Sequence, residues 1–188
     1  ENGTFIGNIS AVQVETGSLT IKDGTFKQIQ ESKYGNTYVI NCIDGEFASG
    51  AATVAIYGGT FVGFDPNVSP EQKDENGNVP SFAAPGVGIT KNADGTFSAA
   101  SGMTAQLLDA DGNSVKAYDS LADAIAAAAA GQTVRLLANA TEDVTIDKNI
   151  TLDLGGKTLT NTNAGHATIT IANGATATVK NGSVVGGT

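Results

Sequence analysis

Short runs in which apolar and polar side chains alternate recur along most of this chain, and turn residues end each run. Examples are Leu19-Thr20-Ile21 and Val144-Thr145-Ile146. A period of two predicts strands with one buried face. Dipeptides such as Asp23-Gly24 and Asn181-Gly182 supply residues that accept a positive φ at the turns. The pattern therefore predicts many short strands joined by tight turns.

A tripeptide repeat in the first half sets the expected stacking. Its copies are 21, 21 and 14 residues apart and lie at Gly3-Thr4-Phe5, Gly24-Thr25-Phe26, Gly45-Glu46-Phe47 and Gly59-Thr60-Phe61. A turn of about 20 residues cannot bury its apolar face alone, so it must stack on copies of itself. We expect one ladder of Phe5, Phe26 and Phe47, a second of Ile21 and Cys42, and Phe61 and Ile56 to join after the shorter spacing.

Cys42 is the only cysteine, so no internal disulfide can form. It occupies a position that isoleucine fills in the other repeats. A buried free cysteine behaves as a small hydrophobic residue, and we favour this interpretation over a reactive thiol.

The second half begins with a predicted helix at about residues 119–130. Asp119 or Ser120 is the expected N-cap and Gly131 the C-terminal stop, and Leu121 opens an apolar face with period 3–4. Brief alternating strands follow it. Two hairpins are expected, one turning at Asp94-Gly95 and one at Asp111-Gly112.

The segment that runs from Ser120-Leu-Ala-Asp-Ala-Ile through Gly131-Gln-Thr-Val-Arg-Leu to Val144-Thr-Ile-Asp-Lys-Asn-Ile resembles the opening of pectate-lyase-like right-handed β-helices. The segment Tyr57-Gly-Gly-Thr-Phe-Val-Gly-Phe-Asp-Pro resembles the closing coils of repeat modules in bacterial cell-surface proteins of the adhesin type. The resemblance implies an all-β fold, a right-handed parallel β-helix with one short capping α-helix. Such folds host lyases, hydrolases, adhesins and virion spikes alike.

Three segments follow from this interpretation. Residues 1–64 are expected to form closing coils, residues 65–103 a connector with a hairpin, and residues 104–188 a hairpin, the cap helix and opening coils. All four prolines fall in the connector. Both chain ends lie inside repeats, and the chain lacks an initiator Met, so we expect it to be excised from a longer precursor.

Charge and hydropathy restrict the partners. Nineteen acidic residues against ten basic ones give a net charge of −9, which argues against nucleic acid as a partner. No apolar run reaches the roughly 20 residues that cross a bilayer, so membrane insertion is not expected.

Candidate sites are weak when they are weighed singly. Asp109, Asp111 and Asn113 resemble the start of a calcium loop, but the twelfth position is Ser120 where a bidentate Glu is needed. A hairpin turn is the favoured interpretation, and weak calcium binding at Asp109 and Asp111 stays open.

The remaining candidates are chiefly polar residues in turns and on strands. A loop histidine without a chemical role is favoured for His166, and solvated turn positions for the three aspartates. Outward-facing strand positions are expected for the threonines, and four tyrosines are a thin supply for stacking on sugars. These candidates are His166, Arg135, Asp143, Asp147, Asp153, the threonines 145, 151, 158, 160, 168, 170, 176 and 178, and the tyrosines 34, 38, 57 and 118. No catalytic, cofactor-binding or metal residue is assigned.

These observations favour a non-enzymatic structural or adhesive module, extracellular or on a bacterial cell surface. We expect it to associate head to tail with neighbouring copies through open β-helix ends, and a host or matrix glycan or protein is a further partner. The alternatives are a β-helix polysaccharide lyase or hydrolase, a glycan-binding module, and a virion spike or fibre component.

Overall fold

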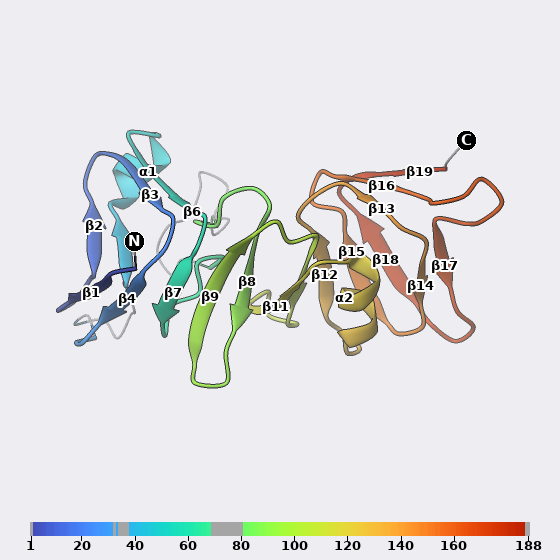
Figure 1. Ribbon diagram of the computed structural model, residues 1–188, viewed down its shortest axis with the longest axis horizontal. Coiled ribbons are helices and arrows are strands. Elements are labelled where there is room, and N and C mark those ends of the chain that lie inside the picture. Colours follow the sequence, from blue (N-terminus) through green and yellow to red (C-terminus); the bar gives the residue numbers. More distant parts are fainter. Residues whose placement is uncertain (1, 32, 34–37, 69–80, 187–188) are drawn as a thin grey trace. The chain divides into compact units, whose positions relative to one another are not determined.

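A computed structural model describes residues 2–31, 33, 38–68 and 81–186, which form two compact units, 1–101 and 102–188 (Figure 1). Each unit is described by itself. Strands dominate both, and the two helices have five and seven residues. The prediction of an all-β protein is confirmed at this level, but only one helix was expected.

The first unit contains seven strands that pair in parallel and then a hairpin. Each parallel strand pairs with the third strand along the chain, or the third before it, which gives the ladders β1-β4-β7, β2-β5 and β3-β6. The strands are β1 (Thr4–Gly7), β2 (Val12–Val14), β3 (Gly17–Ile21), β4 (Thr25–Gln28), β5 (Ile40–Cys42), β6 (Ala52–Ile56), β7 (Gly59–Val62), β8 (Val87–Lys91) and β9 (Thr96–Ser101), with α1 (Asp44–Ala48) after β5.

The second unit repeats this pairing after a hairpin and a helix. Its parallel ladders are β12-β15-β18, β13-β16-β19 and β14-β17. The elements are β10 (Ala105–Leu108), β11 (Ser114–Tyr118), α2 (Leu121–Ala127), β12 (Thr133–Leu136), β13 (Ala140–Thr141), β14 (Val144–Ile146), β15 (Ile150–Asp153), β16 (Thr158–Thr160), β17 (Ile169–Ile171), β18 (Ala177–Lys180) and β19 (Ser183–Val185).

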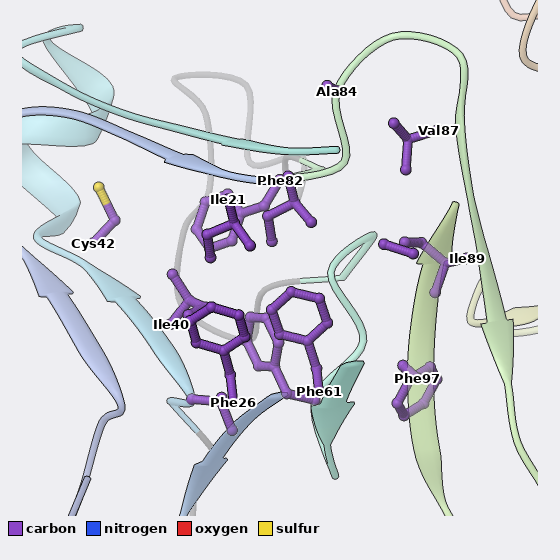
Figure 2. Close-up of a cluster of buried hydrophobic side chains, with 14 of the residues drawn as sticks. Ile21, Phe26, Ile40, Cys42, Phe61, Phe82, Ala84, Val87, Ile89 and Phe97 are labelled. Carbon is purple, nitrogen blue, oxygen red and sulfur yellow. The ribbon is translucent and has the colours of Figure 1, made fainter. Parts of the chain in front are cut away.

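A column of phenylalanine rings forms the core of the first ladder. Phe5 stacks on Phe26 with ring centroids 4.8 Å apart, and Phe26 on Phe61 at 5.3 Å. Exposure falls along the column, from 46% at Phe5 to 4% at Phe26 and 0% at Phe61. Figure 2 shows Phe26 and Phe61 among the buried side chains of this unit. These three rings were predicted to share one ladder, but the predicted member between Phe26 and Phe61 is absent from it.

Phe47 does not belong to this column, so the third step of the predicted ladder is wrong. It lies on α1, and its ring meets Phe82 edge-on at 5.9 Å. The third repeat has Glu46 where the other copies have Thr, and Ala48 follows it. Glu and Ala favour helix, whereas the β-branched Thr favours a strand. The Asp44-Gly45 pair therefore begins a short helix instead of ending a strand.

The pairing of Ile21 with Cys42 is wrong for the same reason. Ile21 pairs with Ile56 on β6, and Cys42 pairs with Val14 on β2. Phe26 and Phe61 are 35 positions apart in the sequence, which corresponds to two repeats of 21 and 14 residues. They nevertheless pair directly on adjacent strands, so these two repeats advance the ladder by only one strand.

The helix α2 packs against one end of the second core, where it contacts β10, β11, β12 and β14. Leu121, Ala124 and Ile125 are buried. Ser120 is the N-cap, and its Oγ accepts the N–H of Asp123 at 3.1 Å. The helix ends at Ala127, before the expected Gly131, and Lys148 Nζ donates to the carbonyl of Ala126 at 2.6 Å.

Both expected hairpins are confirmed, and each covers the last strand at one end of a parallel ladder. β9 lies antiparallel on β7 and β10 antiparallel on β12. Gly95 and Gly112 have φ of 82° and 89°. Val87, Ile89, Phe97 and Ala99 belong to the first core, so this part of the expected 65–103 connector packs within unit one. The residues 69–80 of that connector lie outside the described residues.

The gradient of burial along the phenylalanine column predicts a gradient of stability. Phe61→Ala should lower the free energy of unfolding of the first unit by about 3–5 kcal/mol, because it leaves a cavity between packed layers. Phe5→Ala should lower it by about 1 kcal/mol, since the Phe5 ring is half exposed. Urea denaturation followed by circular dichroism measures both, and equal losses would contradict the layered core.

Candidate functional site

Asp153 ties together three segments of the second unit, at the neighbouring strands β12, β15 and β18. Its carboxylate accepts hydrogen bonds from Arg135 Nε at 3.1 Å, from the N–H of Gly155 at 3.0 Å and from Asn181 Nδ2 at 3.1 Å. Arg135 lies on β12 and Asn181 in the corner between β18 and β19. Burial alone would raise the pKa of Asp153, but these hydrogen bonds and the positive charge of Arg135 outweigh it and lower the pKa. The sequence placed Asp153 in a solvated turn, which is wrong because the residue is buried.

Asp143 and His166 approach each other, which the sequence did not predict. Asp143 accepts hydrogen bonds from the hydroxyl and the N–H of Thr162, and the hydroxyl bond chiefly lowers its pKa. His166 Nδ1 lies 3.8 Å from Asp143 Oδ2, beyond hydrogen-bond range. The His166 side chain is 65% exposed. The Asp143 carboxylate therefore holds the loop after β16 through Thr162.

Asp109 organises the β10–β11 turn. Its Oδ1 accepts the N–H groups of Asp111 and Asn113 at 3.0 and 2.8 Å, and the Asn113 side chain also donates to it. The side-chain bond from Asn113 is the main cause of a lowered Asp109 pKa, which burial partly opposes. The carboxylate is thus used in the hairpin turn that the sequence favoured.

The carboxylates do not converge. Asp147 is exposed, whereas Asp143 and Asp153 are bound to different partners. Within residues 2–31, 33, 38–68 and 81–186, no group of three or more His, Cys, Asp or Glu side chains is placed to hold a metal ion.

The thiol of Cys42 is fully buried in the first core. Figure 2 shows it at the margin of the cluster that contains Ile21, Ile40 and Phe26. Burial, and secondarily the charge of Asp44, raises its pKa. The thiolate needed for reactivity is therefore disfavoured, as expected of a cysteine that replaces an aliphatic residue.

A surface groove of about 570 Å³ lies beside β3 and is lined by Thr20, Lys22, Tyr57 and Ser101. Tyr57 is 45% exposed and could stack on a sugar ring. Of the other tyrosines, Tyr38 is buried, Tyr118 packs beneath Lys116, and Tyr34 lies outside the described residues. Among the threonines expected to face outward, Thr168 is buried instead.

Exposed apolar side chains gather on the outermost strands of the two stacks. Of the eleven exposed large hydrophobic residues among the described residues, seven lie near the start of unit one or on the edge strands of unit two, namely Phe5, Ile6, Ile9, Ile171, Val179, Val184 and Val185. β1 is the edge of its sheet, and β17, β18 and β19 are each the edge of theirs. At the other end of each stack, β7 and β12 are covered by hairpin strands.

Comparison with known proteins finds no matching family model, no matching curated protein and no matching solved structure. The resemblance to pectate-lyase-like β-helices therefore stays a prediction. None of the described helices is long and apolar enough to cross a membrane.

The burial of Cys42 gives a direct chemical prediction. The thiol should resist a maleimide reagent in the folded protein and react on denaturation, since reagent and solvent reach it only after unfolding. Cys42→Val should lower stability by less than about 1.5 kcal/mol, because the two side chains have similar volumes. Rapid labelling of the native protein would contradict this placement.

Asp153 gives a prediction on pH. Because its pKa is lower in the folded protein, its stabilising effect is complete above the unfolded value of about 3.9 and is lost as the pH falls through the folded value. Asp153→Asn should lower the free energy of unfolding at neutral pH by about 1–3 kcal/mol, and this deficit should shrink in acid. Urea denaturation at several pH values measures it. Asp147→Asn, an exposed change of equal charge, should show neither effect.

Proposed function

We propose that this protein is a non-enzymatic, extracellular structural or adhesive module whose two units are short right-handed parallel β-helices. The support is the pairing pattern, in which each parallel strand meets the third strand before or after it. Three strands then make one turn, and successive turns stack. α2 is the cap of the second stack, with Leu121 and Ile125 turned into its core.

The observation that carries the functional proposal is the uncovered apolar edge at the start of unit one and at the end of unit two. Edge strands pair readily with other strands, and an exposed cluster of apolar residues marks an interaction surface. The partner is a second copy, because Gly3-Thr4-Phe5-Ile6 at one end repeats the pattern of Gly182-Ser183-Val184-Val185 at the other. A contact between different ends is heterologous, so it extends into a filament or array unless rotation closes it.

A bacterial cell-surface stalk is the first setting for such an array, and a virion spike or fibre the second. The polar clusters support a structural role, since Asp109, Asp143 and Asp153 each hold a turn or loop in place. The groove at Tyr57 favours glycan binding as the second candidate function. A polysaccharide lyase or hydrolase is the third.

Measurements of association test the structural function. Light scattering and negative-stain microscopy over a concentration series should show particles that lengthen with concentration. Phe5→Lys should abolish this growth, because it places a charge on the outer apolar layer, whereas Ile29→Lys should not. Ile29 is a suitable control because it is exposed to a similar degree, 59% against 46%, and lies outside the terminal strands.

Incubation with acidic and neutral polysaccharides, with and without calcium, tests the other two functions. We expect neither product nor binding. Product formation overturns the structural proposal, and saturable binding without turnover that Tyr57→Ala removes supports the glycan-binding function instead. A particle that stays monomeric at every concentration overturns head-to-tail association.

A further inference from the structure

Each unit contains a corner with the same sequence pattern. In unit one, Ile21-Lys22-Asp23-Gly24-Thr25-Phe26 leads from β3 to β4, and in unit two Val179-Lys180-Asn181-Gly182-Ser183-Val184 leads from β18 to β19. In both corners the residue after the glycine donates its N–H to the layer beneath, Thr25 to the Gly3 carbonyl at 2.8 Å and Ser183 to the Lys157 carbonyl at 3.1 Å.

The glycine is required at this corner in both units. A Cβ on Gly24 would lie 3.1 Å from the Gly3 carbonyl oxygen, and a Cβ on Gly182 would lie 2.5 Å from that of Lys157. The sheet β1-β4-β7 therefore corresponds to β13-β16-β19, and β3-β6 corresponds to β12-β15-β18. The remaining pair, β2-β5, corresponds to β14-β17.

This correspondence fixes how the end of one copy can meet the beginning of another. The last turn of unit two has β18 and β19, but the third sheet stops one layer earlier, at β17. Unit one starts with β1, which corresponds to β19, and continues with β2 and β3. If β1 were laid on top of β19, one strand position above β17 and one above β18 would stay empty.

The empty positions disappear if β1 occupies the place of β19. β1 then lies on β16, β2 on β17 and β3 on β18, and every sheet continues without a gap. Resting on the head-to-tail association proposed above, we propose that β1 of a second copy displaces β19 and completes the stack on β16. β19 is thus a placeholder that fills the acceptor position until another copy binds.

The side chains favour this exchange over the reverse one. Ser183, Val184 and Val185 face Thr158, Leu159 and Thr160 across the ladder. β1 offers Thr4, Phe5 and Ile6 at the same three positions, each of the same character and larger. Phe5 would cover the buried Leu159 more fully than Val184 does, and it would keep its stacking on Phe26. β19 itself is exposed at all three residues.

Cross-linking between separately made proteins tests the exchange. In a Cys42→Val background, Ile6→Cys protein is mixed with Thr160→Cys protein and oxidised. Exchange places these residues on adjacent strands about 4.8 Å apart, within the Cα range of a disulfide, so a covalent heterodimer is expected. The matched control is Ile6→Cys mixed with Val185→Cys, which exchange keeps apart.

The outcomes are distinct. A heterodimer with Thr160→Cys but not with Val185→Cys supports the exchange, and the opposite result overturns it while leaving head-to-tail stacking intact. Association without either cross-link also overturns the exchange. If the Ile6→Cys, Thr160→Cys double variant cross-links only within one chain, a closed monomer replaces the second copy.

A charge variant gives an independent readout in the full chain. Val184→Lys should weaken the hold of β19 on Leu159 and thereby increase association at least severalfold in light scattering. Phe5→Lys should abolish it. Simple end-on stacking predicts that both changes abolish association, so loss of association in Val184→Lys overturns the exchange.

Discussion

Strands of two to six residues cannot bury an apolar face alone, and the rest of this structure depends on that constraint. Parallel strands stack about 4.8 Å apart, so like side chains meet directly, as Phe5, Phe26 and Phe61 do. Burial then depends on the neighbours above and below, which is why Phe61 is sealed while Phe5 is half exposed. The hairpins and α2 supply the missing neighbour at only one end of each unit.

The features that the sequence predicted well have local causes. The turns at Asp94-Gly95 and Asp111-Gly112 need a glycine with positive φ, and α2 has its cap at Ser120 and an apolar face within a few residues. The layer to which a residue belongs is a non-local property. Cys42 and Phe47 obey the 21-residue spacing of the sequence repeat. The 35-residue segment that contains them, however, pairs with the preceding segment through β5 on β2 and β6 on β3, so the spacing does not predict their partners.

The polar chemistry was less predictable for a related reason. Arg135, Asp153 and Asn181 are 18 and 28 residues apart, and only stacking brings them together. A carboxylate in that position joins successive turns at a corner, where strands end and backbone groups need other partners. Asp143 does the same for the loop at Thr162. The sequence shows isolated aspartates in turns and gives no sign of which strands will lie beside them.

Edge strands at the end of a stack invite unspecific pairing, and most proteins cover or charge them. Here β1 and β19 carry Phe5, Ile6, Val184 and Val185 and no charged residue. In the proposed β-helix, specificity comes from shape, because the chain would follow a helical path. A stack that ends partway through a turn accepts a partner without gaps at only one step. The strand that would leave in the proposed exchange, β19, is shorter than β1 and has the smaller side chains. In the proposed β-helix, the geometry that exposes the ends therefore also restricts how they can be covered.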